Sequence, residues 1–310
     1  MKKIVNFAIG GTGDIIQAFQ VSHFIQKKVG PDNTEVICLS RDEVFEPIKL
    51  LFGDKFTVYQ HELKERWGEN YEIITNPLIL KGEKDKYSEI IVSAPDLLFR
   101  ARQYSFNFNK YNCSPQSVVQ TRLLTHLWNP ENIIYCAFCN TTTKGYNFPQ
   151  SKKLIELLAT LLPNYKFYVP VLLNWNNETI IDAEKNAELK NLPSNVLVDF
   201  NPPWERALSF MSKSCYGIAL DSAPYHLFYQ FGIERLCLDP RFESGHINKM
   251  WQSRWRNIGM HDSVPISSPA ESIAQLVYTN IMVPQTTLLP KWHVMNEPNE
   301  NWQMSLGFKF

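Results

Sequence analysis

The sequence lacks a surplus of charge of either sign and any long apolar run, and these absences exclude several classes of protein. Lys plus Arg and Asp plus Glu number 31 each, so no net field draws the chain to nucleic acid or to an anionic membrane, and such a partner would need a local patch. The first apolar run, Ile4–Ile9, ends at Gly10-Gly11 and is too short for a signal sequence or a membrane span. We therefore expect a cytoplasmic protein without a transmembrane segment.

A complete set of metal ligands is also lacking. Cys136 and Cys139 have the spacing of a ligand pair, but no second Cys or His pair at suitable spacing completes a zinc site. Several of the 6 cysteines lie within apolar runs, as reduced buried thiols do. The sequence also has no Asp-x-Asp motif, no low-complexity run and no short repeat. We expect neither a bound metal nor a cofactor.

What is present is an ordinary globular composition in a chain long enough for two domains. Hydrophobic residues make up 44% and charged residues 20%, which excludes disorder, collagen and a disulfide scaffold. At 310 residues the chain exceeds the usual span of one core. The pattern breaks at 128–132, so we predict domains over 1–130 and 131–282. The tail, 283–310, is rich in Pro and aromatic residues and is expected to pack back on the first domain.

Strand and helix patterns alternate in both halves. In the first half, strands are predicted at 3–9, 35–39, 55–59, 72–75 and 89–93, and helices at 14–29, 44–51 and 96–127, the last with a polar interruption at 107–114. In the second half, strands are predicted at 133–138, 166–172, 195–199, 215–219 and 235–238, and helices at 150–161, 177–190, 203–212 and 224–231. Such alternation predicts an α/β protein with two doubly wound, Rossmann-like parallel sheets facing across a cleft.

The most informative stretch follows the strand predicted at 215–219. The carboxyl end of that strand leads into Asp221-Ser222, and one of these two residues is predicted to cap the next helix. Pro224 suits the first turn of that helix. Free backbone N–H groups and the positive end of the helix dipole favour a phosphate there, and His226 adds a donor one turn in. The alternative is a capped helix whose histidine only packs in the core.

This segment resembles the signature of glycosyltransferase family 9, the ADP-heptose:lipopolysaccharide heptosyltransferases. In that signature a strand ends in Asp-Ser/Thr-Gly-x-x-His and is followed by an apolar helix, a glycine and another strand. Asp221, Ser222 and His226 match in type and spacing. Ala223 replaces the family's glycine, and Glu234-Arg235 replaces a usual proline. The resemblance implies a GT-B fold and a divergent transferase that uses a nucleotide-diphosphate sugar, and the departures leave the donor sugar open.

A second match lies in the run Gly10-Gly11-Thr12-Gly13-Asp14. Family members open with a strand, a short turn and Gly-Asp before a helix, and the resemblance implies that Asp14 is the catalytic base. A carboxylate at a helix start can take a proton from an acceptor hydroxyl, and Gly11, Thr12 and Gly13 allow the backbone to approach a ligand closely. The alternative is that Asp14 is an N-cap beside a tight turn. The run lacks the G-x-G-x-x-G spacing of a nicotinamide dinucleotide site.

A third candidate segment is the polar loop after the strand at 133–138. Family members have a basic residue there, shortly before an aromatic-proline pair, and Phe148-Pro149 fits that pair. Lys144 would stabilise the leaving diphosphate, the hydroxyls of Thr141-Thr142 would bind phosphate oxygens, and Tyr146 completes the predicted donor contacts. Glu178, after the next strand, is predicted to contact the nucleoside. An exposed lysine in a polar loop is also commonplace, so this segment alone is weak.

The three segments occur in the family's order and predict a metal-independent, inverting glycosyltransferase for hexosyl, heptosyl or pentosyl groups. Its expected partners are a nucleotide sugar and a hydroxyl acceptor on a glycan or a lipid-linked saccharide. Arg100, Arg102 and Lys110 would meet an acidic acceptor or are simply solvated.

Two alternatives stay open. One is a DNA glycosyltransferase acting on a hydroxylated base, because the segment His246–Arg256 interleaves cations with tryptophans, as backbone binding and base stacking require. The same segment is also typical of an amphipathic helix with snorkelling cations. The other alternative is a non-catalytic protein that binds nucleotide sugars.

Overall fold

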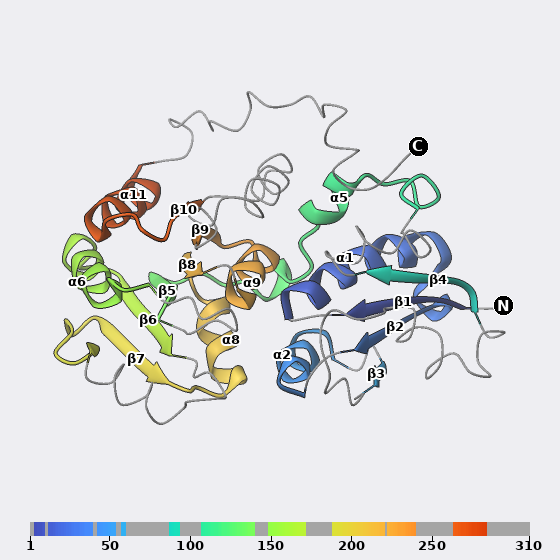
Figure 1. Cartoon of the computed structure of the whole chain (residues 1–310), viewed down its shortest axis with the longest axis horizontal. Helices are drawn as coiled ribbons and strands as arrows, with labels where there is room; N and C mark the ends of the chain where they lie inside the picture. The colour runs from blue at the N-terminus through green and yellow to red at the C-terminus, as the bar shows by residue number, and fades with distance from the viewer. Residues whose placement is uncertain are drawn as a thin grey trace. The chain divides into compact units, whose positions relative to one another are not determined.

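The computed structural model describes residues 3–9, 12–39, 42–53, 57–59, 87–93, 107–139, 148–171, 188–220, 222–239 and 263–283 (Figure 1). These residues form two compact units, one within residues 1–121 and the other within 122–298. The sequence placed the boundary at 130/131. The predicted strand at 72–75, nearly all of the predicted helix at 177–190 and nearly all of the tail lie outside the described residues.

Unit 1 is built on a parallel sheet whose described strands follow the order β3-β2-β1-β4. The strands are β1 (Lys3–Ile9), β2 (Thr34–Leu39), β3 (Thr57–Tyr59) and β4 (Tyr87–Ser93), and the main helices are α1 (Thr12–Val29) and α2 (Asp42–Phe52). Helix α1 joins β1 to β2, and the 3-10 turn η1 (Pro31–Asn33) precedes β2. Phe19 of α1 stacks on Phe52 of α2, with ring centroids 4.3 Å apart.

A buried polar side chain fixes α1 against β1. Asn6 is fully buried, and its Nδ2 donates to the Ala18 carbonyl at 2.9 Å and to Ser22 Oγ at 2.7 Å. An apolar residue would leave α1 free to slide along the sheet, whereas these bonds set its register. The helix therefore begins at a fixed place after β1.

The chain leaves unit 1 through a short, well-anchored segment. Helix α5 (Pro115–Gln120) is capped by Ser114, whose Oγ accepts from the Ser117 N–H at 3.0 Å, and at its end Gln20 Nε2 donates to the Thr121 carbonyl at 2.7 Å. Within unit 2, Leu123 N–H donates to Gln230 Oε1 at 3.0 Å. The residues after it, including the turn η3 (Thr125–Leu127), bond to unit 2, which accounts for the division at 121/122.

Unit 2 contains a parallel sheet whose six described strands follow the order β10-β9-β8-β5-β6-β7 (Figure 1). Its strands are β5 (Ile133–Ala137), β6 (Lys166–Val171), β7 (Val196–Phe200), β8 (Tyr216–Leu220), β9 (Glu234–Asp239) and β10 (Ser263–Pro265). Its helices are α6 (Ser151–Leu161), α8 (Trp204–Ser212), α9 (Ala223–Phe231) and α11 (Ala270–Met282). The prediction of an α/β protein with two doubly wound parallel sheets is confirmed.

The two faces of this sheet carry different side chains because consecutive strand residues point to opposite faces. On one face Ile134, Cys136 and Ile218 pack in a core with α6 and α11. On the other face Tyr135 contacts Phe228 of α9 edge to face, at 5.3 Å between centroids, and Tyr168 stacks on Phe210 of α8 at 4.0 Å. Helices that follow neighbouring strands β5 and β8 thus cover opposite faces.

Candidate functional site

The sheet of unit 2 reverses its winding between β5 and β8. From β5 the chain passes through α6 to β6 on one side, whereas from β8 it passes through α9 to β9 on the other. The two strands are neighbours, with Ala137 paired to Ala219 near their carboxyl ends. Open α/β sheets bind ligands outside the carboxyl ends of the strands at such a switch point. The segments after β5 and β8 are the two that were predicted from the sequence to bind the donor phosphates.

The amino end of α9 is the described part of this site. Ser222 occupies the N-cap position with extended backbone angles, and Pro224 lies in the first turn, as predicted. The Ser222 hydroxyl, however, donates to the Leu220 carbonyl at 3.1 Å, and no side chain among the described residues caps the helix. The sequence predicted Asp221 or Ser222 as the cap: Ser222 holds the N-cap position but its hydroxyl bonds back to the strand, and Asp221 lies outside the described residues. His226 is partly exposed and meets the Tyr225 ring edge to face at 6.0 Å.

Close packing against β8 holds α9 in place. A Cβ on Gly217 would lie 2.4 Å from Cδ2 of Phe228, so only glycine permits this approach. The helix ends at Gly232, whose φ of 91° suits glycine, and Ile233 N–H donates to the Phe228 carbonyl at 2.9 Å. No role for Gly217 was predicted from the sequence. The feature of the sequence that could have indicated this role is a lone glycine within an apolar strand.

A buried cation reaches the first turn of α9 from β9. Arg235 is 6% exposed, and its Nη1 donates to the Tyr225 carbonyl at 2.7 Å. Its guanidinium carbon lies 4.0 Å from the Tyr225 ring centroid and 4.6 Å from that of Tyr229. From the sequence, Arg235 was predicted only to depart from the family pattern. The feature of the sequence that could have indicated this contact is a charged residue within an apolar strand.

In unit 1 the glycine-rich sequence 10–13 also follows the strand at which the winding reverses. Strand β1 lies between β2 and β4, and α1 leads from β1 toward β2. Thr12 and Gly13 open α1, and Asp14 is the third residue of the helix, so it lies in the first turn at the carboxyl end of β1. The Thr12 residue is mostly buried. The Asp14 side chain lies outside the described part of the structure, so its role as the base stays a prediction.

The remaining predicted site residues lie outside the described residues. They are Gly11, Thr141, Thr142, Lys144, Tyr146, Glu178 and Asp221. Arg100, Arg102 and the segment His246–Arg256 also lie outside them. Lys110 is described and forms an ion pair with Glu89 in unit 1. The pair Phe148-Pro149 precedes α6 as predicted, and Phe148 is fully buried against Phe138.

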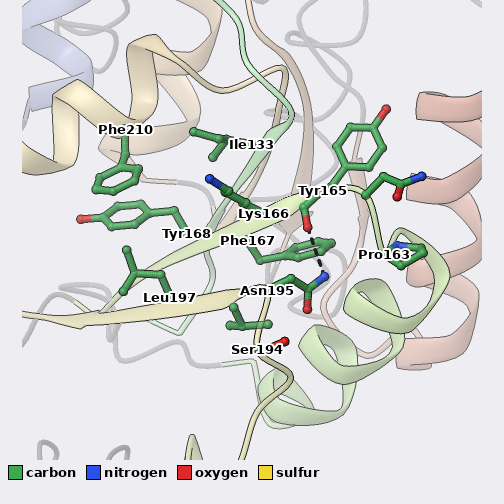
Figure 2. Close-up of a pocket in the computed structure, with 12 residues that line it drawn as sticks. Ile133, Pro163, Tyr165, Lys166, Phe167, Tyr168, Ser194, Asn195, Leu197 and Phe210 are labelled. Atoms are coloured by element: carbon green, nitrogen blue, oxygen red, sulfur yellow. Dashed lines mark hydrogen bonds between the residues drawn. The ribbon is translucent and has the colours of Figure 1, made fainter.

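A pocket of about 450 Å³ opens at the opposite edge of the unit 2 sheet (Figure 2). Ile133, Lys166 and Val196, the first residues of β5, β6 and β7, line it, together with the stacked pair Tyr168 and Phe210. Figure 2 shows the Asn195 amide within it, donating to the Tyr165 carbonyl at 3.1 Å. Because ligands of open α/β sheets bind at the carboxyl edge, we do not assign the donor to this pocket.

The described cysteines are free thiols, and most of them are fully buried. Burial raises the pKa of Cys38 to about 12, and burial together with Cys139 raises that of Cys136 well above its usual value. These thiols are therefore protonated and unreactive at neutral pH. Among the described residues, no three His, Cys, Asp or Glu side chains gather as metal ligands.

None of the helices that the structure describes has an apolar stretch long enough to cross a bilayer.

Comparisons with known proteins bear on the fold. No family model matches the sequence, and no curated protein matches it significantly. Among solved structures, the E. coli heptosyltransferase WaaC with ADP-2-deoxy-2-fluoro heptose is 10% identical, with a TM-score of 0.55 over 90% of this chain and 99% of that chain. The same enzyme with ADP is 11% identical, with a TM-score of 0.55 over 90% and 98%. A glycosyl transferase family 9 structure from Veillonella parvula is 10% identical, with a TM-score of 0.50 over 89% and 90%.

At this identity the likeness shows the fold, and it extends over nearly the full length of the chain. The chain has the GT-B fold. The predicted resemblance to glycosyltransferase family 9 is confirmed at the level of the fold, because the similar structures include a member of that family and a heptosyltransferase.

Proposed function

We propose that the protein is a glycosyltransferase that transfers a sugar from a nucleotide-diphosphate donor to an acceptor hydroxyl. The observation that carries the proposal is the amino end of α9, which lies at the switch point of unit 2 and has no described side-chain cap. Backbone N–H groups there, and the positive end of the helix dipole, suit a diphosphate. The WaaC structures contain ADP and an ADP-heptose analogue, which supports a donor of this class.

The proposed reaction is a direct displacement with inversion. Asp14 takes the proton of the acceptor hydroxyl as the oxygen forms a bond to the anomeric carbon, and the bond from that carbon to the donor phosphate oxygen breaks. The electron pair leaves with the nucleoside diphosphate, whose charge is stabilised by the first turn of α9, by His226 and by Lys144. The scheme requires no metal. We propose an acceptor on a glycan or a lipid-linked saccharide.

Donor binding is tested by thermal shift with ADP-, UDP-, GDP- and CDP-sugars. A ligand that binds only the folded protein raises the melting temperature, by an amount that grows with concentration above Kd. We expect one nucleotide class to stabilise the protein. Lack of a response to all four would contradict the proposal, and stabilisation without transfer or slow donor hydrolysis would instead identify a non-catalytic binding protein.

The role of Asp14 is tested separately with D14N. The variant should lose transfer by at least about a hundredfold, because general base catalysis contributes about that much or more, while the Kd of the donor stays within about twofold. The matched control is D32N, on the exposed turn η1, which should behave as wild type. Equal loss of donor binding and transfer in D14N would refute the assignment of Asp14 as base.

A further inference from the structure

We propose that the pocket at the amino edge of the unit 2 sheet binds a short acidic saccharide. The first residues of β5, β6 and β7 line this pocket of about 450 Å³, together with Phe210 of α8 (Figure 2). Its volume lies within the range of about 300–1,000 Å³ that small-molecule sites have. The predicted donor segments follow the carboxyl ends of the strands instead, so this would be a second site in the same unit.

One wall of the pocket is apolar and held in place. The Phe210 and Tyr168 rings are stacked with planes 9° apart, and Tyr168 is fully buried. The Tyr168 hydroxyl donates to Asp199 Oδ2 at 3.0 Å, and Arg206 Nε lies 2.7 Å from the same oxygen. Leu197, which pairs with Tyr168 across the sheet and lines the same pocket, leaves 41% of its surface exposed. A ligand that covers Leu197 would therefore gain apolar contact with a wall that is already formed.

Polar groups also line the pocket. The Asn195 amide is oriented by its own hydrogen bonds, because Nδ2 donates to the Ala159 carbonyl at 3.3 Å and to the Tyr165 carbonyl at 3.1 Å. These bonds leave Oδ1 as an acceptor for a ligand. Asn164 and Ser194 are exposed on the same lining, and their side chains form no hydrogen bond with the described part of the chain. Hydroxyl groups of a ligand would find both donors and acceptors here.

The charge of the lining is positive. Lys166 is the one charged residue among the described residues that line the pocket, and it is exposed. It forms no ion pair with a described residue, whereas Lys152, Lys153 and Lys213 of the same unit each pair with a glutamate. An ammonium group beside amide and hydroxyl groups suits a carboxylate.

Together these features favour a saccharide over other ligands. A sugar ring presents C–H groups to an apolar wall and hydroxyl groups to the polar lining, so both parts of the pocket gain partners. A lipid chain would cover Asn195 and Lys166 without bonding to them, which costs free energy. A nucleoside diphosphate would bring several negative charges to a single lysine.

The test is a titration followed by ligand-observed NMR with two disaccharides of similar size. One is glucuronate linked to N-acetylglucosamine, and the other is uncharged diacetylchitobiose. We expect both to bind, the acidic one about two- to fivefold more tightly, which is the usual effect of one exposed ion pair. K166Q should remove that difference, and L197S should weaken both disaccharides at least about threefold through lost apolar contact.

The matched control is K49Q, at an exposed lysine of unit 1, which should bind both disaccharides as wild type does. Melting curves without ligand establish that each variant is folded. If L197S does not fold, K166Q and the comparison of the two disaccharides decide.

Three results would overturn the inference. The first is failure of both disaccharides to bind at millimolar concentration. The second is binding that folded K166Q and L197S leave unchanged, because the sugar then lies elsewhere, such as in the acceptor site. The third is equal affinity of wild type for the two disaccharides, which would refute the role of Lys166. No nucleotide sugar enters this test, so failure of the proposed transferase function would be seen separately, in the donor titrations.

Discussion

Replacement of Gly217 by alanine tests how α9 is held against the sheet. The new Cβ would lie 2.4, 2.5 and 2.7 Å from three ring atoms of Phe228, well inside normal contact. The ring has little room to move, because it is fully buried and packs edge to face on Tyr135. Relief of the clash therefore requires α9 to shift away from β8.

The cost follows from two opposing effects. Overpacking a core usually costs about 1–3 kcal/mol, whereas replacing glycine by alanine restricts the unfolded chain and returns about 0.4–1 kcal/mol. We therefore expect G217A to lower the free energy of unfolding of unit 2 by about 1–2 kcal/mol. Because the helix shifts, its first turn should also bind pyrophosphate more weakly.

The assay is urea denaturation monitored by hydrogen exchange in peptides from β8 and α9, which report on unit 2 alone. F228L, which shortens the ring side chain, is the partner variant in a double-mutant cycle. G217A/F228L should cost less than the sum of the two single variants by about 1 kcal/mol. Strictly additive costs, or a G217A protein as stable as wild type, would refute the steric argument.

Three further predictions concern the linker, the thiols and pH. Q230M removes the acceptor of the Leu123 N–H and should cost about 1–3 kcal/mol and speed proteolysis near 121–124, whereas Q275M on the exposed surface of α11 should not. Iodoacetamide at pH about 8 should spare Cys38 and Cys136 in the folded protein and label both in urea, because their raised pKa values leave little thiolate; labelling without denaturant would contradict this. Burial, and to a lesser degree Lys27, lowers the pKa of His23, so the unfolded chain binds the proton more tightly and unit 1 should lose stability as pH falls below about 6.5. H23Q should flatten this dependence in urea titrations at pH 7.5 and 5.5, and an unchanged slope would exclude His23 as its source.

The strands and helices nearest the switch points could be predicted from sequence because local signals agree there. Strand β8 is a short apolar run bounded by Asp221-Ser222, and Pro224 marks the helix that follows, so α9 was predicted to within one residue at its start. Helix α11 was not predicted, although Ala270, Ile273, Ala274 and Val277 recur at helical spacing and are buried. Strand β10 has only three residues and carries too little pattern to detect.

Details of the site depend on tertiary contacts that residue types do not encode. A serine at an N-cap position predicts a hydrogen bond from its side chain to the start of the helix, but the Ser222 hydroxyl donates to the Leu220 carbonyl instead. The same local sequence is compatible with either hydrogen bond. Likewise, the strand pattern placed Arg235 on β9, but its burial depends on how Tyr225 and Tyr229 of α9 fold over it. The roles of Asp14, Lys144 and Asp221 remain predictions.

The most direct test of the central claim is hydrogen exchange by mass spectrometry on the full chain, with and without saturating ADP or UDP. We predict slower exchange in peptides that cover the first turn of α9, residues 222–226, and no change in α11. Bound nucleotide that leaves α9 unprotected, or that protects instead the pocket around Tyr165 and Lys166, would contradict it.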